Sequence, residues 1–95
     1  MVELIRITPE HDGIHKYRAE FRVNGRTKVV KFGAVGYLDF TQHHDENRRR
    51  AYILRHSARE DWTNPVKAGA LSRWVLWEHP SFEKAVLMFR RKFGV

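Results

Sequence analysis

Three histidines and two acidic residues lie close together in the middle of the chain, and side chains of these types bind metal ions. They are His43, His44, Asp45, Glu46 and His56. A metal site needs two or three such side chains to converge with an open coordination position. His43 and His44 are adjacent and point apart in most backbone conformations, and His44 meets His56 only if the loop folds back on the next helix. The pattern therefore favours capping and buried hydrogen bonding, and we predict no metal and no cofactor.

Enzymatic chemistry has little support elsewhere in the chain. Asn47 and His56 are nine positions apart, as in the helical part of HNH nucleases, but a strand-borne histidine at a suitable distance is missing and cysteine is absent. Ser72 lies in ALSRW, which lacks the glycines of a nucleophile elbow. Gly33 and Gly36 match no phosphate-loop pattern and are expected to permit a tight bend. We therefore predict a protein that is not an enzyme.

The charge balance points to a polyanionic partner. Lysine and arginine number 18 against 11 acids, for a net charge of +7. Such a bias implies affinity for nucleic acid, an acidic membrane surface or acidic protein. Membrane is disfavoured because no basic amphipathic helix has a clean apolar face, and the remaining alternative is a soluble domain that happens to be basic. The candidate phosphate-contacting residues are Arg18, Arg22, Lys31, Arg48, Arg49 and Arg55.

Length and composition limit the class of protein. A chain of 95 residues predicts one domain, residues 1–95, and 42% hydrophobic with 13% aromatic residues is enough for one core. The absence of cysteine excludes disulfides and thiolate zinc sites. No apolar run approaches the ~18 residues of a membrane span, and the N-terminus has no signal-peptide pattern. We expect an intracellular, soluble, non-secreted protein.

The first third of the chain predicts three strands. Val2–Thr8 reads as a short strand, and 15–23 alternates apolar and charged residues up to Asn24-Gly25, the strongest short hairpin signal. Residues 26–32 form the return strand. A two-residue turn places Tyr17 opposite Phe32. The expected core face is Tyr17, Ala19, Phe21, Val30 and Phe32. The opposite face carries Arg18, Arg22, Thr27 and Lys31 around Glu20 and Val29.

That second face is either a basic binding surface or an ordinary solvated face, since antiparallel sheets often leave one side wet. From Ile14 to Lys31 there are six lysines or arginines against one acid. The hairpin is therefore predicted to have one apolar and one basic face.

The connection from Phe32 to Asp45 is expected to begin against the core. We predict that the core buries the side chains of Tyr37, Leu38 and Phe40, because exposing such apolar side chains to water costs free energy. Tyr52 and His56 are four apart on one helical face. We predict that Tyr52 is structural and that His56 hydrogen-bonds Asp39 or Thr41.

Three helices are predicted in the second half. The first runs from about Asp45, its N-cap, to Ala58. Its consecutive arginines, residues 48–50, point in directions about 100° apart around the helix axis, so they cannot all contact the same partner. Asn47, Ala51, Leu54 and Ala58 lie along one line of it, flanked by Tyr52 and Ile53.

The second helix is expected to start at Pro65 and to end before Pro80. The third is capped by Ser81 and ends at Gly94, and its residues 90–92 are cations that suit the helix dipole. The stripe of the second helix comprises Val66, Ala70, Trp74 and Trp77, with Leu71 and Val75 beside it. The stripe of the third comprises Phe82, Ala85, Val86, Phe89 and Phe93.

Two blocks of this sequence carry a family resemblance. FGAVGYLDFTQHHDENRRRAYILRH and SRWVLWEHPS, residues 32–56 and 72–81, follow a pattern close to FGxxGYxDxT, YxxRH and SRWxLWxxPS. With these blocks the chain resembles a family of small uncharacterised proteins of large double-stranded DNA viruses of algae and amoebae. The resemblance implies a viral protein that lies in the cytoplasm or nucleus of the infected host cell and is made in quantity or packaged in the virion. Such a protein contacts either the genome or the capsid. The resemblance implies no particular activity.

These observations lead to one fold and two functions. We predict an α+β fold: a small antiparallel sheet of about three strands with a β-hairpin, followed by three helices packed on its apolar face. The first function is nucleic-acid binding through phosphates without strong sequence specificity, with DNA favoured over RNA. The second is a structural virion or minor capsid component that docks on acidic protein, favoured if Leu87, Met88 and Trp62 form an exposed patch.

Overall fold

The computed structural model describes residues 1–95 and has the predicted α+β architecture, an antiparallel sheet followed by helices. The sheet contains β1 (Val2–Pro9), β2 (His15–Val23) and β3 (Arg26–Ala34) in that spatial order. The helices are α1 (Phe40–His43), α2 (Glu46–Ser57), α3 (Ala68–Leu71), the π-helix η1 (Ser72–Leu76) and α4 (Phe82–Phe93). No helix is long and apolar enough to cross a membrane.

The predicted hairpin register is confirmed. Tyr17 pairs with Phe32 and Val23 with Arg26 across the turn. Asn24 has a φ of 51° and Gly25 a φ of 82°, the left-handed conformations that this turn requires. β1 adds to the other side of β2, with an irregularity between Leu4 and Arg6. The two-residue turn and the alternation therefore determine which side chains share a face.

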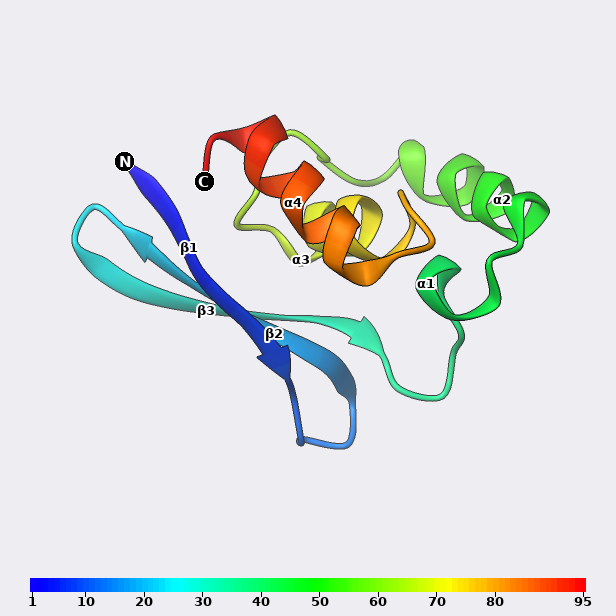
Figure 1. Ribbon diagram of the computed structural model, residues 1–95, viewed down its shortest axis with the longest axis horizontal. Helices are drawn as coiled ribbons and strands as arrows, with labels where there is room; N and C mark the ends of the chain where they lie inside the picture. Colours follow the sequence, from blue (N-terminus) through cyan, green and yellow to red (C-terminus); the bar gives the residue numbers. More distant parts are fainter.

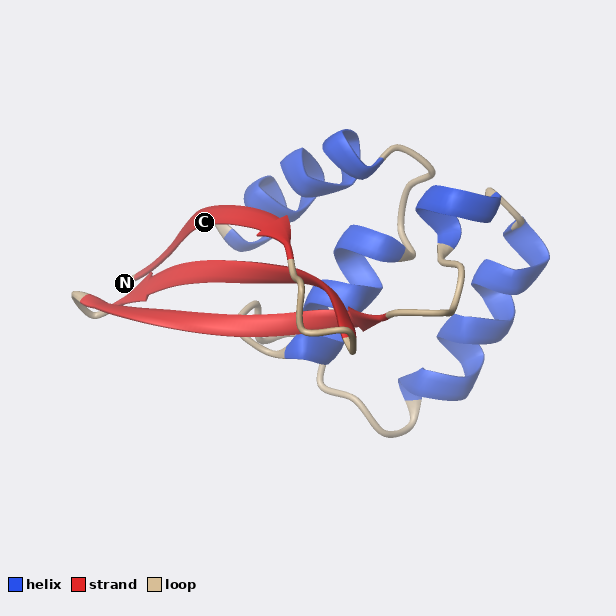
Figure 2. Cartoon of the chain, turned by 90° about the horizontal axis from the view of Figure 1, so that it is seen from below, coloured by secondary structure: helices blue, strands red, loops and turns tan.

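The core lies between one face of the sheet and the helices that follow it. Figure 1 and Figure 2 show α3 and α4 on one side of the sheet and α1 and α2 beyond the end of β3, with the other sheet face bare. The buried cluster joins residues of all three strands to residues of α3, η1 and α4. Its members are Leu4, Ala19, Phe21, Phe32, Leu71, Val75, Leu76 and Phe89. The apolar sheet face is thus covered by α3, η1 and α4, as predicted for the second and third helices, whereas α2, the first predicted helix, contributes no residue to this cluster.

The connection between β3 and α1 corrects one expectation. Phe40 is buried as predicted, but 74% of Tyr37 and 57% of Leu38 are exposed. Gly36 has a φ of 92°, and the amide of Tyr37 donates to the carbonyl of Ala34 at 3.4 Å. This turn carries the chain outward before it returns to the core at Asp39, so the two side chains point into solvent.

The second predicted helix is shorter and differently wound. Asn64 closes a turn by accepting from the amide of Val66, so α3 begins at Ala68 and not at Pro65. The helix continues as η1, in which hydrogen bonds join residues five apart, and ends at Leu76. The wider turn rotates the expected stripe. Trp74 and Trp77 are only partly buried, whereas Ala70, Leu71, Arg73, Val75 and Leu76 are buried.

The last helix follows the prediction closely. Ser81 accepts from the amide of Lys84, and Gly94 ends α4 with a φ of 67°. Ala85 and Phe89 are buried on its inner side. Arg90 donates to the carbonyl of Leu4 at 2.8 Å, so this cation ties the helix to β1.

Candidate nucleic-acid interface

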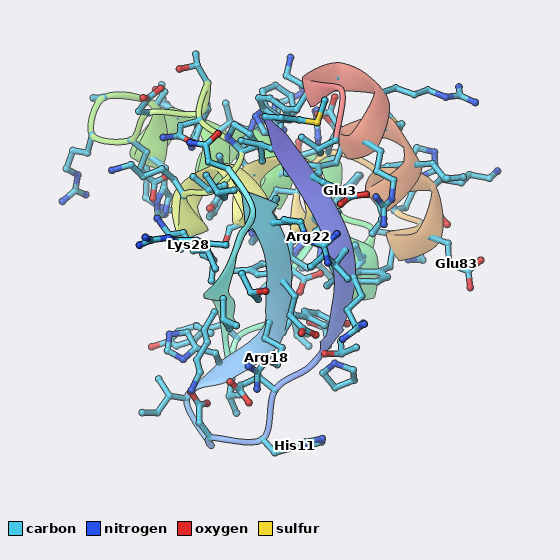
Figure 3. The ribbon with its side chains drawn as sticks, turned by 90° about the vertical axis from the view of Figure 1, so that its left-hand side faces the viewer. Glu3, His11, Arg18, Arg22, Lys28 and Glu83 are labelled. Carbon is cyan, nitrogen blue, oxygen red and sulfur yellow. The ribbon has the colours of Figure 1, made fainter.

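The outer face of the sheet is rich in cations, but most of them are paired. Arg22 meets Glu3 at 3.2 Å, and Arg6 meets Glu20 at 3.0 Å. Figure 3 shows Arg22 and Glu3 on neighbouring strands of this face. β1 therefore supplies an acid that the hairpin sequence lacks.

Two acids of the β1–β2 loop form ion pairs with Lys31. Its ammonium lies 3.0 Å from Glu10 and 3.3 Å from Asp12. The Glu10 hydrogen bond raises the pKa of Lys31, and the His15 amide and ring with other donors hold the pKa of Asp12 far below its usual range. Arg18 is the exception on this face: it is half-buried, forms no ion pair, and its Nε has no partner.

The arginines of α2 divide into two groups. Arg49 is committed to the fold: it donates to the carbonyl of Trp77 at 2.8 Å and to Glu78 at 2.6 Å. Arg49 and Arg50 also pair with Glu46 in the first turn. Arg48 and Arg55 take no part in these pairs and are exposed.

Arg48 and Arg55 share one face of α2, because residues seven apart lie almost in line on a helix. Both line a cleft of about 720 Å³ that is bounded by α2, by β2, β3 and the β3–α1 connection, and by α3 and η1. Lys31 lines this cleft as well. From Asn47 to Arg59 there are five arginines and no acid. This side of the cleft is therefore basic, and its two lining arginines are free to bind an anion.

The cleft has an aromatic wall. Tyr52 and Trp77 stack at a centroid distance of 4.2 Å and an angle of 4°, and His56 stacks on the other side of Tyr52 at 4.1 Å. Burial raises the pKa of the Tyr52 phenol, which stays neutral. These residues hold α2 against the end of η1, so the prediction that Tyr52 is structural is confirmed. On α2 Tyr52 is buried, whereas Leu54 of the predicted apolar line is 77% exposed.

The predicted partner of His56 is wrong. Its Nδ1 lies 3.2 Å from Glu60, and Glu60 also accepts from the indole of Trp62 at 2.9 Å. A Cβ on Gly69 would come within 3.2 Å of Glu60, so the glycine makes room for this carboxylate. His56 is therefore occupied by the turn after α2 and does not reach Asp39.

Asp39 is held instead by Lys16. The Lys16 ammonium donates to Asp39 at 2.7 Å and to Gln42 at 2.6 Å. The Asp39 carboxylate caps α1 by accepting from the amide of Thr41, and the Gln42 side-chain oxygen accepts from the Asp39 amide, which completes a capping box. With Asp39 only 3% exposed, this pair anchors the far end of the β3–α1 connection.

The other histidines have local roles. The Asp45 amide donates to Nδ1 of His43, and burial lowers the pKa of that ring. His44 has a φ of 55° and ends α1. No group of three or more histidine, aspartate or glutamate side chains converges as a metal site would require.

The sequence prediction missed Arg73, which lies in the SRW block and is 8% exposed. Its guanidinium packs over the rings of Trp62 and Trp74, at 5.3 and 4.2 Å, and donates to Glu78 at 2.8 Å. Glu78 thus joins Arg73 to Arg49. In the sequence Arg73 stands next to Trp74, and this neighbouring pair is the signal that indicates such a stack. The packing of Arg73 against the tryptophan rings therefore accounts for the SRW block.

The fold and the cleft describe a small basic α+β protein with unpaired arginines on one helix. Residues 5–56 match a family of unknown function, DUF5754. Because the match spans more than half of the chain, this protein belongs to that family. The matched residues contain most of the sheet, the β3–α1 connection and nearly all of α2, and so include much of the cleft lining. No curated protein and no solved structure matches this chain.

Proposed function

We propose that this protein binds nucleic acid through phosphate contacts, without strong sequence specificity, on the cleft face of α2. The supporting observation is that Arg48 and Arg55 are exposed, unpaired and on one helical face. Two helical turns separate them by about 10 Å along the axis. A guanidinium free of internal partners binds a phosphate without first breaking an ion pair.

The remaining cations have smaller parts in this proposal. Arg22 and Lys31 would have to leave their acids to contact phosphate, and Arg49 would have to leave Glu78. Arg18 is unpaired and lies on the sheet face away from α2. We therefore assign the main contacts to Arg48 and Arg55. The protein acts without catalysis, in a virus-infected host cell, with DNA as its main ligand.

A second function is favoured by exposed apolar side chains on α4. Leu87 is 56% and Met88 41% exposed, whereas Trp62 is half-buried beside Arg73 and Glu60 and is not an exposed part of such a patch. An apolar centre with a polar rim is typical of a protein interface. In this alternative the protein is a structural virion component that docks on acidic protein, and it sediments as an oligomer or associates with virion proteins.

A binding titration at two salt concentrations tests the first function. On duplex DNA the logarithm of affinity falls with the logarithm of salt by about 0.9 per phosphate contact. Replacing both Arg48 and Arg55 by alanine should weaken binding and reduce the slope by about 1.8. Replacing both Arg22 and Arg6 by alanine is the matched control, because it removes the same formal charge from paired positions on the sheet that lie outside the cleft lining.

Two outcomes contradict the proposal. One is no binding by the unaltered protein even at low salt. The other is a control variant that loses as much affinity and slope as the variant lacking Arg48 and Arg55, because the site would then include the sheet.

A further inference from the structure

Tyr37 is the most exposed aromatic side chain of the molecule, at 74%, and it lines the cleft that Arg48 and Arg55 also line. Its neighbours Val35 and Leu38 are 49% and 57% exposed. Tyr52 and Trp77 stack on each other, whereas Tyr37 stacks on no other ring. The cleft thus has one aromatic ring with free faces.

The segment that carries Tyr37 is anchored at both ends. On one side Phe32 is 1% exposed and the amide of Val35 donates to the carbonyl of Ile14 at 3.0 Å. On the other side Asp39 is 3% exposed and bonded to Lys16. The outward position of the ring is therefore set by the fold around it.

Leaving large apolar side chains in water forgoes the free energy of burying them, about 25 cal/mol per Å² of apolar surface. An exposed ring that lines the same cleft as unpaired arginines has a specific use. In proteins that bind single strands, bases stack on aromatic side chains while cations follow the phosphates. In a duplex, the bases stack on each other and offer no free face to such a ring.

We propose that the cleft binds single-stranded nucleic acid, with a base stacked on Tyr37 and neighbouring phosphates bound by Arg48 and Arg55. This inference rests on the proposed function and narrows its ligand to unpaired strands. A stacked base contributes about 1–3 kcal/mol, so loss of the ring corresponds to an affinity loss of about fivefold or more.

Fluorescence anisotropy with three labelled probes tests the inference: a short oligodeoxythymidylate, an oligouridylate and a DNA duplex of equal length. The unaltered protein should bind the single strands more tightly than the duplex at the same salt. Tyr37→Ala should weaken single-strand binding about tenfold and leave duplex binding unchanged. Tyr37→Phe should retain single-strand binding, because the ring face remains.

Leu87→Ala is the matched control, since it removes an exposed apolar side chain on α4, outside the cleft lining. It should leave all three affinities unchanged, and thermal melting should show that every variant is folded. The ratio of the uridylate and thymidylate affinities distinguishes RNA from DNA as the ligand.

The two proposals fail in different ways. If Tyr37→Ala keeps full single-strand affinity while loss of Arg48 and Arg55 weakens binding, stacking is wrong and phosphate binding stands. The same conclusion follows if Tyr37→Phe loses as much as Tyr37→Ala. If the unaltered protein binds none of the probes at low salt, both proposals are wrong.

Discussion

The outer face of the sheet and the cleft face of α2 are both rich in cations, yet they differ in how much of that charge is available. On the sheet, Glu3 and Glu10 approach from outside the hairpin and neutralise Arg22 and Lys31. On α2, the acids lie at the N-terminus and pair with Arg49 and Arg50, so Arg48 and Arg55 have no acidic partner. Counting the charges of the hairpin alone therefore overstates the positive charge of the sheet face, because residues outside the hairpin supply the acids that pair with its cations.

The two regions also differ in what their ion pairs contribute to stability. Along the cleft the side chains of Lys16 and Asp39 are 13% and 5% exposed, whereas those of Arg22 and Glu3 are each 56% exposed. Exposed pairs contribute at most about 1 kcal/mol, while breaking a buried pair costs about 3–5 kcal/mol. Burial therefore ranks the following predictions.

The largest effect is expected at Asp39. Asp39→Ala leaves the Lys16 ammonium without its carboxylate partner and removes the cap of α1, so the free energy of unfolding should fall by about 3 kcal/mol or more. Urea unfolding measures the change. Asp45→Ala is the matched control, since Asp45 caps α2 at an exposed position and should cost about 1 kcal/mol. Equal losses in the two variants would contradict the comparison.

An intermediate effect is expected at Glu78, whose side chain is 23% exposed. Burial raises the pKa of its carboxyl, but hydrogen bonds from Arg73 and Arg49 outweigh this and hold the pKa below its usual range. Glu78→Gln should lower the free energy of unfolding by about 2 kcal/mol at neutral pH, between the values for exposed and buried pairs.

The pH dependence of this loss follows from the direction of the pKa shift. Because the folded pKa lies below the unfolded value of about 4.3, the stabilisation is fully present above that pH and is lost as the pH falls through the folded pKa. The difference between the unaltered protein and Glu78→Gln should therefore shrink in acid. Urea unfolding at a series of pH values measures it, and a difference that persists unchanged in strong acid would rule out the charge as the cause.

The smallest effect on stability is expected on the sheet. Replacing both Glu3 and Glu20 by glutamine should change the free energy of unfolding by less than about 1 kcal/mol per pair. It also frees Arg22 and Arg6, so the sheet face gains affinity for duplex DNA and the salt dependence steepens. If affinity and slope stay unchanged in a mobility-shift titration, pairing is not what limits the sheet face.

Local features of the sequence predicted much of the fold. Asn24-Gly25 set the hairpin register, and Asp45, Ser81 and Gly94 set helix ends, because each acts through its own neighbours. The second helix was predicted less well. Its start depends on a turn closed by Asn64, and its buried side depends on a π-helical winding that no apolar period indicates.

The candidate site was predicted only in part. The sequence predicts Arg48 and Arg55 together with four other cations, and the structure brings these two and the acid-paired Lys31 to one cleft. Tyr37 was expected in the core on its apolarity, but the turn at Gly36 points it outward. His56 is predicted to bond Asp39 or Thr41, yet its partner is Glu60, four residues further along the chain.

By itself, the sequence determined the order of strands and helices, the hairpin register and the net positive charge, because these depend on neighbouring residues or on composition. Tertiary structure alone decided which cations are unpaired. A guanidinium or ammonium is paired where β1, the β1–β2 loop or Glu78 places a carboxylate within about 3 Å of it. Tertiary structure also decided that Tyr37 shares a cleft with Arg48 and Arg55, since the backbone turn that exposes the ring is anchored by Lys16, a residue of another strand.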